Sequence, residues 1–383
     1  MKKRVLILLL LLGGAAPAWA VDVGGDVYFQ YSYTLPTYDS AYDPRSSNND
    51  FSAFDITRAR LELFGEPQPN WLAHLATDVE RVHDYQADVN GDGKLEDVTT
   101  PDAGRFALVL RYAHLNWQPK TYVGVDAGII ETPWIGFVDQ ANGFRFVDRL
   151  LAERAGWLGQ LTDVGLAVKG DFPGHYGSYR AQIDSGNGAQ DFEASKQKAG
   201  EGRVTFVPAF AAGVLGHFSL SLGGRYNTSE DPPGPALDRD AVGMALLHYR
   251  CRYINAGLEG SLDSHWGRER QKPTSNGMAA TGWLSVKPWP WFEPFARGER
   301  FDPDLDSSGR GRAASRLDGE TLAADRDGFW GLLAGLGFHP INDVDAALAG
   351  RITWFDETYR GGPHDGETIA PAASLLASLA FSF

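Results

Sequence analysis

The stretch DVNGDGKLEDVTT, residues 88–100, has the oxygen-rich spacing of a calcium-binding loop. Oxygen-bearing side chains alternate along it, and a glycine follows where such loops turn sharply. The candidate ligand positions are Asp88, Asn90, Asp92, Lys94 and Glu96. Thr99 occupies the twelfth position, where a bidentate acid normally completes the shell. Because Asn-Gly-Asp-Gly is also a strong turn sequence, a weak calcium site and a plain turn both remain open.

No other group of residues has the spacing of a catalytic site. None of the nine histidines falls in an H-E-x-x-H motif, and no G-x-S-x-G nucleophile motif is present. The order Asp263, Ser264, His265 lies at the end of an alternating segment and is typical of the start of a loop. We therefore predict no enzymatic activity and no required cofactor, with a hydrolase as a disfavoured alternative.

The first twenty residues predict export. Three basic residues, an apolar run and a small-residue end (Ala18 to Ala20) follow one another as in a secretory signal peptide. The apolar run is shorter than the ~20 residues that a membrane-spanning helix needs, which disfavours a retained anchor. We expect a signal peptide over residues 1–20 and one structural domain over residues 21–383.

The charge of the chain excludes one class of partner. Its formal net charge is −14, and the predicted signal peptide holds three of its 35 basic residues. Nucleic-acid binding requires Lys and Arg to replace the counterions of the phosphates, so we expect no nucleic-acid partner. A single cysteine, Cys251, excludes an internal disulfide.

Hydrophobicity with a period of two residues runs through the chain after residue 20. In LTDVGLAVKG, for example, Val164, Leu166 and Val168 alternate with small or charged residues. Such a polar second face makes a poor protein core, but it suits a barrel with lipid outside and water inside. We predict sixteen strands, at 24–34, 51–65, 71–82, 105–117, 121–131, 161–171, 178–187, 201–208, 216–227, 240–249, 252–264, 278–287, 291–301, 327–338, 344–356 and 370–383. The count is uncertain by two.

The predicted fold is therefore an all-β transmembrane antiparallel β-barrel of about sixteen strands with short periplasmic turns and long outer loops. The connections alternate in length as this architecture requires. Aromatic residues such as Trp71, Trp117 and Trp291 stand beside short connections, as expected of an interfacial girdle. The last strand ends SLLASLAFSF, with Phe383 on its apolar face. This ending resembles the terminal strand that assembly machinery recognises in outer-membrane proteins.

A sixteen-stranded barrel leaves an aqueous channel, so its inward positions and its longest loops decide what passes. Inward basic and acidic positions are equally numerous, which favours no strong net selectivity. Arginines on adjacent strands either form a basic ladder or pair with neighbouring acids. The predicted pore-lining residues are Arg58, Arg60, Glu62, Asp78, Glu80, Arg105, Arg111, Asp126 and Lys169.

The segment 132–160 is long, amphipathic and rich in arginine. We predict that it folds into the pore as a constriction loop; a helical cap outside the barrel is the alternative. Its candidate site residues are Arg145, Asp148, Arg149, Glu153 and Arg154.

The segments FDITRARLELFG, VDAGIIETPWIGF and FVDRLLAERAGWLGQLTDVG resemble the phosphate-selective porin O/P family. The resemblance lies in residues 54–60, 128–136 and 146–165, and it is closest over residues 51–170. It implies a trimeric sixteen-stranded channel with an inward third loop. Dense arginine and lysine, as in phosphate-selective members, is not evident here, so anion selectivity does not follow directly.

Together these observations predict a passive channel for small hydrophilic solutes and ions, such as phosphate or other anions. We expect it in the outer membrane of a Gram-negative-type bacterium, as a homotrimer in contact with the lipid bilayer and lipopolysaccharide. Calcium in the second outer loop is the one predicted optional ligand. A structural or adhesive barrel with a plugged lumen is the alternative.

Overall fold

The computed structural model describes residues 4–5, 21–35, 52–81, 106–154, 158, 160–186, 188–189, 198–208, 217–230, 237–266, 275–302, 305, 328–356 and 371–383. Among these residues, no helix has the length and hydropathy needed to cross a membrane.

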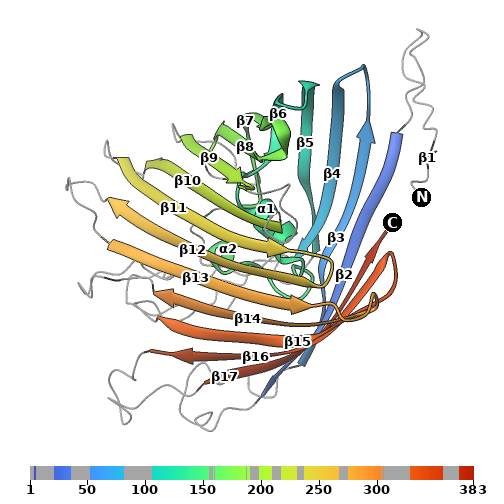
Figure 1. Cartoon of the computed structure of the whole chain (residues 1–383), viewed down its shortest axis with the longest axis vertical. Coiled ribbons are helices and arrows are strands. Elements are labelled where there is room, and N and C mark those ends of the chain that lie inside the picture. The colour runs from blue at the N-terminus through green and yellow to red at the C-terminus, as the bar shows by residue number, and fades with distance from the viewer. Residues whose placement is uncertain are drawn as a thin grey trace.

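Sixteen antiparallel strands close into a barrel (Figure 1). They are β2 (Val21–Leu35), β3 (Ser52–Gly65), β4 (Trp71–Arg81), β5 (Phe106–Lys120), β6 (Val123–Glu131), β7 (Thr162–Asp171), β8 (Gly177–Asp184), β9 (Lys198–Phe206), β10 (Phe218–Glu230), β11 (Leu237–Arg250), β12 (Ile254–Trp266), β13 (Ser275–Val286), β14 (Phe292–Asp302), β15 (Phe329–Ile341), β16 (Val344–Phe355) and β17 (Ala372–Ser382). Each pairs with its neighbours in sequence, and β17 pairs with β2. A two-residue strand, β1 (Arg4–Val5), pairs with the start of β2. The predicted fold and all sixteen strands are confirmed, each to within a few residues.

The two faces of the strands have opposite character. Leu258 and Leu262 of β12 are 62% and 57% exposed, whereas Glu259 and Asp263 between them are 3% and 4% exposed. Val164, Leu166 and Val168 on β7 are exposed in the same way. The barrel therefore turns apolar side chains outward and polar side chains inward, the reverse of a soluble protein.

Two bulges correct the alternation where the sequence departs from it. Between β2 and β3 the register shifts, so that Tyr28 faces Arg58 while Phe29 faces Ile56. Between β4 and β5 a shift after Ala76 leaves Arg111 opposite no residue of β4. A bulge inserts one residue and so changes the face on which the following residues lie. Arg58 and Arg111 are both buried within the barrel wall as a result.

Short connections join the strands at one end of the barrel, with rings clustered beside them. Trp71 and Trp117 lie on neighbouring strands with ring centroids 6.4 Å apart. Trp289 and Trp291 stack at 5.8 Å in the short connection between β13 and β14. These four rings are 38–54% exposed, as expected for side chains at a membrane interface.

The C-terminal residue completes the closure of the barrel. Phe383 accepts a hydrogen bond from the Gly25 amide (3.2 Å) and donates one to the Gly25 carbonyl (3.0 Å). Gly25 is required because a Cβ there would lie 2.3 Å from the Arg60 carbonyl oxygen and 2.7 Å from the Phe383 ring.

We expect G25V to impair assembly, because the added side chain collides with the β3 backbone and with the terminal ring. Heat-modifiable migration in gel electrophoresis measures the folded fraction, which should fall for G25V. The matched control is G260V, since no atom lies within 4 Å of a Cβ at Gly260. Equal folded fractions for the two variants would contradict this account of closure.

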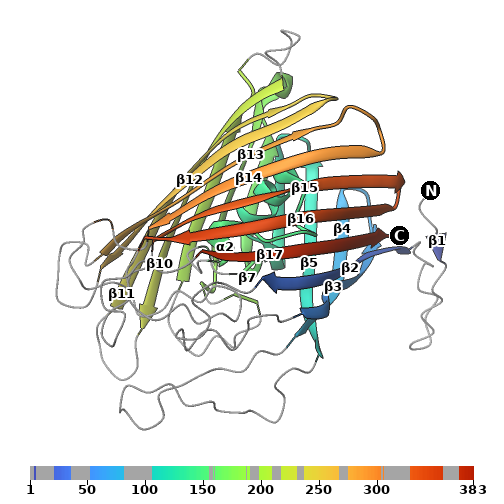
Figure 2. The same ribbon diagram turned by 90° about the horizontal axis from the view of Figure 1, so that it is seen from below.

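The segment after β6 crosses the interior of the barrel. Its helices α1 (Ile135–Asn142) and α2 (Leu151–Arg154) lie inside the ring of strands in both views (Figure 1, Figure 2). The two ends of the segment lie side by side in the wall, where the Thr132 amide donates a hydrogen bond to the Leu161 carbonyl at 2.9 Å. We call residues 132–160 the inner loop.

Candidate functional site

The inner loop is held against one side of the barrel by an apolar interface. Ile135, Val138, Leu150 and Leu151 are at most 1% exposed and form a cluster with inward residues of β11 to β15. The wall residues of that cluster are Val242, Met244, Leu246, Ala279, Trp283, Phe301 and Phe329. An apolar inner face is unusual in a water-filled barrel, and here the loop covers it.

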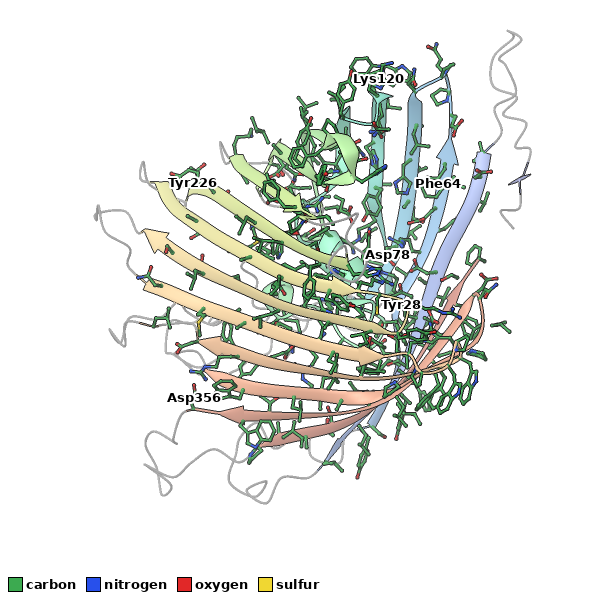
Figure 3. All side chains as sticks on the ribbon, viewed as in Figure 1. Tyr28, Phe64, Asp78, Lys120, Tyr226 and Asp356 are labelled. Atoms are coloured by element: carbon green, nitrogen blue, oxygen red, sulfur yellow. The ribbon has the colours of Figure 1, made fainter. Side chains whose placement is uncertain are left out.

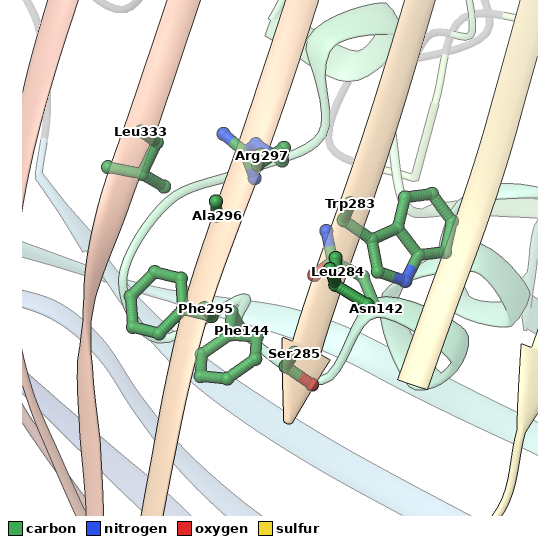
Figure 4. A pocket seen from close by; sticks show the side chains of 9 residues that line it. All are labelled: Asn142, Phe144, Trp283, Leu284, Ser285, Phe295, Ala296, Arg297 and Leu333. Atoms are coloured by element: carbon green, nitrogen blue, oxygen red, sulfur yellow. The ribbon is translucent and has the colours of Figure 1, made fainter. Parts of the chain in front are cut away.

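A second contact lies between the two helices. Phe144 stacks on Phe295 of β14 with centroids 4.0 Å apart, and Phe146 meets Tyr28 of β2 edge-on at 6.4 Å. Figure 4 shows Phe144 and Phe295 side by side, with Trp283 and Arg297 nearby. Gln30 of β2 donates to the Val147 carbonyl at 2.7 Å. Phe137 of α1 also contacts Arg203 of β9, whose guanidinium lies 3.8 Å from the ring centroid. The loop therefore contacts the wall from β9 round to β2.

Buried ion pairs join the loop to β14. Arg154 contacts Glu299 at 2.5 Å, and Arg297 contacts both Glu299 (2.9 Å) and Asp148. Arg351 of β16 lies 3.6 Å from Asp148. Removing one member of such a buried set leaves an uncompensated charge, so these pairs fix where the loop lies.

Further hydrogen bonds from the loop and to the loop add to this attachment along β12. The Trp134 indole donates to Glu259 at 2.7 Å, and the Asn255 amide donates to the carbonyls of Ala141 and Asn142 at 2.8 and 3.1 Å. Gly223 of β10 lies under Trp134, whose ring would be 2.6 Å from a Cβ at that position. These contacts fix the position of Trp134 and of the end of α1 against β10 and β12.

Arg145 forms a charged centre within the loop itself. It contacts Glu153 at 2.7 Å and also Asp139, and all three side chains are at most 14% exposed. Burial, opposed by Arg145 and reinforced by Glu153, raises the pKa of Asp139 to about 6. Burial also acts on Glu153, but the Arg145 contact outweighs it and lowers the pKa of that carboxyl. Arg149, in contrast, is exposed.

This centre predicts a pH-dependent ion preference. Below about pH 6 Asp139 is protonated, so the loop loses one negative charge and Arg145 faces only Glu153. We expect the reversal potential in a salt gradient to move toward anions as pH falls from 7 to 5. The D139N variant should show the acidic value throughout that range. A pH response of the same size in D139N would assign it to another group.

The predicted arginines on β3 and β5 are paired with acids. Arg58 and Arg111 lie 3.3 and 3.8 Å from the same Asp78 carboxylate oxygen. Arg60 contacts Asp26 at 2.5 Å and Glu62 at 3.0 Å. Of the two sequence-based alternatives, the described contacts match pairing rather than a free basic ladder. The Arg58 guanidinium also lies 5.5 Å from the centroid of the Tyr28 ring. Tyr28 and Asp78 are labelled in Figure 3.

Three cations of β7, β8 and β9 stand directly opposite one another. Lys169 faces Arg180, and Arg180 faces Arg203. Asp126 contacts both Lys169 (3.0 Å) and Arg180 (2.9 Å). Within the described part of the chain, Arg203 contacts no carboxylate; it bonds Thr205 at 3.0 Å and lies 3.8 Å from the Phe137 ring of α1. We call Lys169, Arg180 and Arg203 the basic row.

The other predicted site residues lie beyond the described structure. The Glu80 side chain and Arg105 are among them, as are the calcium-loop positions Asp88, Asn90, Asp92, Lys94 and Glu96. Among the described residues, no group of three or more His, Cys, Asp or Glu side chains is arranged to hold a metal ion. The calcium hypothesis therefore stays a prediction.

Asp26 and Asp139 were not among the predicted site residues, although they form ion pairs with the predicted residues Arg60 and Arg145. Asp26 has a signal in the sequence, because it lies on the same alternating face as Tyr28 and Gln30. Asp139 has none, since its partner depends on how the inner loop turns back after Gly143, whose φ is 84°.

Comparison with solved structures shows the fold. An anion-selective porin from Comamonas acidovorans has a TM-score of 0.62 and 10% identity, with 95% of this chain and all of that one covered. The outer membrane channel DcaP of Acinetobacter baumannii has a TM-score of 0.60 and 12% identity, covering 97% and 100% of the two chains. A trimer form of the outer membrane protein OmpT of Vibrio cholerae has a TM-score of 0.57 and 10% identity, covering 96% of this chain and 99% of that one.

No family model and no curated protein matches the sequence. The structural neighbours are outer-membrane proteins with the same sixteen-stranded barrel, and at such low identity they establish architecture alone. The resemblance to the phosphate-selective porin O/P family thus has no support from a family model.

Proposed function

We propose that this protein is a passive outer-membrane channel whose passage is narrowed by the inner loop. The observation that carries the proposal is a loop held by buried ion pairs and two apolar clusters inside a barrel with a polar interior. Transport of this kind needs only width and fixed charge: large solutes are excluded, and ions of one sign are favoured. The porin and channel descriptions of the structural neighbours support it.

We further propose that the favoured solutes are small oxyanions such as phosphate, and that the basic row is where they meet the wall. Like charges directly opposite across strands destabilise a sheet. Asp126 forms ion pairs with two members of the row, Lys169 and Arg180, and no ion pair between described residues joins it to Arg203. The buried Glu131 also acts on Arg180 and Arg203, so two carboxylates face three cations, and an anion beside Arg203 supplies the remaining negative charge. The resemblance of residues 51–170 to the phosphate-selective porin O/P family supports this proposed preference for oxyanions.

The remaining assignments follow from the same architecture. We propose an exported protein with a cleaved signal peptide over residues 1–20, an outer-membrane location, and contact with lipid and lipopolysaccharide. A homotrimer is supported by the trimer form of one structural neighbour.

Reversal potential in a KCl gradient, repeated with added phosphate, tests the oxyanion proposal. We expect an anion-favouring potential and a current that falls as phosphate occupies the basic row. A cation-favouring potential with no effect of phosphate would limit the protein to a general pore.

A further inference from the structure

Two histidines face each other on the inner wall, outside the inner loop and close to the basic row, since the charges of Lys169 and Arg180 act on His114. His74 of β4 and His114 of β5 are directly opposite in the strand register. Their neighbours in sequence, Leu75 and Leu115, are 43% and 48% exposed on the lipid side, so both imidazoles lie on the lumen side.

Each ring has a buried nitrogen without a hydrogen-bond partner in the described structure. These atoms are His74 Nε2 and His114 Nδ1. Buried polar atoms are nearly always paired with protein, water or an ion, so two such atoms on facing side chains call for a ligand. The nearest acidic oxygen, on Glu62, is 4.0 Å from His74 Nε2, too far for a hydrogen bond.

We infer that His74 and His114 form a binding site for a first-row transition metal ion of the Zn²⁺, Ni²⁺ or Cu²⁺ class. Imidazole is a preferred ligand of these ions. A zinc–nitrogen bond of about 2.0–2.1 Å puts each ring centroid ~3 Å from the ion, and two centroids around a tetrahedral ion are then ~5 Å apart. The observed centroid separation is 5.1 Å, with the rings at 82° to each other.

The surroundings hold the first ligand in place. His74 lies between the rings of Phe64 and Tyr112, stacked at 4.3 and 4.9 Å. A ligand whose ring is held by packing loses little freedom when the ion binds. Glu62, 4.0 Å from His74 Nε2, is paired with Arg60 at 3.0 Å and does not ligate the ion. Because Arg60 acts on His74, and Lys169 and Arg180 act on His114, the ion is held by the imidazole nitrogens and not by a surplus of negative charge. With two protein ligands, the remaining positions are filled by water, so the ion binds reversibly within the lumen.

Equilibrium dialysis of the detergent-solubilised full chain against Zn²⁺ tests this inference. Calcium at ~1 mM or above is kept in the buffer to fill sites made only of oxygen ligands. We expect one Zn²⁺ per chain, and in H74Q and H114Q a loss of affinity at least as large as the ~10-fold that removal of an outer-shell partner causes. The control is H248Q, because His248 is also on the inner wall but bonds Asn255 at 2.8 Å.

Unchanged Zn²⁺ affinity in H74Q and H114Q, with heat-modifiable migration intact, would overturn the inference. A second measurement follows from the proposed function: micromolar to millimolar Zn²⁺ should reduce the single-channel current of the wild type but not of H74Q. Failure of Zn²⁺ to bind leaves the metal-free current unaffected and refutes only the metal site. Absence of any current refutes the channel itself.

Discussion

The R203Q channel is expected to lose much of its preference for anions. Within the described part of the chain no ion pair joins Arg203 to a carboxylate. The charge of Glu131 acts on Arg203, but it also acts on Arg180, so R203Q leaves that acid with Arg180 and takes away one positive charge from the basic row. Unit charges about 4 Å apart interact by ~1 kcal/mol in water, which corresponds to about a fivefold change in local anion occupancy. We therefore expect phosphate to reduce the current about fivefold less effectively, with the reversal potential moved toward cations.

The matched control removes the same charge outside the lumen. Arg252 is exposed in the short connection between β11 and β12, beside the Tyr253 ring. R252Q should keep the wild-type reversal potential and the wild-type response to phosphate. If R203Q and R252Q behave alike at low salt, where screening is weakest, the basic row is not part of the selective passage.

Excision of the inner loop is expected to give the largest change in conductance. Thr132 and Leu161 are already joined by a backbone hydrogen bond of 2.9 Å, so residues 134–159 can be replaced by a four-residue Gly/Ser turn without moving β6 or β7. With the loop gone, the lumen is bounded only by the wall. We expect several-fold higher single-channel conductance and passage of larger neutral solutes in a liposome-swelling assay.

The same excision should also lower stability. It uncovers the inward apolar cluster around Leu246, Trp283 and Phe301 and leaves Glu299 without Arg154. The temperature at which heat-modifiable migration is lost should therefore fall. An insertion of the same Gly/Ser turn in the short connection at residues 251–253 controls for the added sequence. Unchanged conductance in a folded excision variant would show that the loop does not constrict the passage.

The strands and their faces could be predicted from sequence because lipid and water impose a strict period of two. The predicted strands 201–208 and 240–249, for example, are confirmed as β9 and β11. The bulges could not be predicted, since Ile56 and Ala59 both carry apolar side chains and the shift becomes evident only from the register of β2 and β3.

The charged groups of the lumen were predictable by position but not by partner. Alternation identifies Arg60 and Glu62 as inward, whereas the contact of Arg60 with Asp26 depends on the register of β2 and β3, which places these two residues opposite each other. The contacts Arg154–Glu299 and Arg145–Glu153 depend on the path of the inner loop, which no local propensity specifies. His74 and His114 are forty residues apart, and only the register of β4 and β5 brings them together.

The most direct test of the account is the current carried by the purified full chain in a planar lipid bilayer. A lumen filled with water predicts discrete, stable current steps whose size rises with the conductivity of the salt solution. A chain that remains soluble and monomeric without detergent, or that enters the bilayer and carries no current, would contradict it.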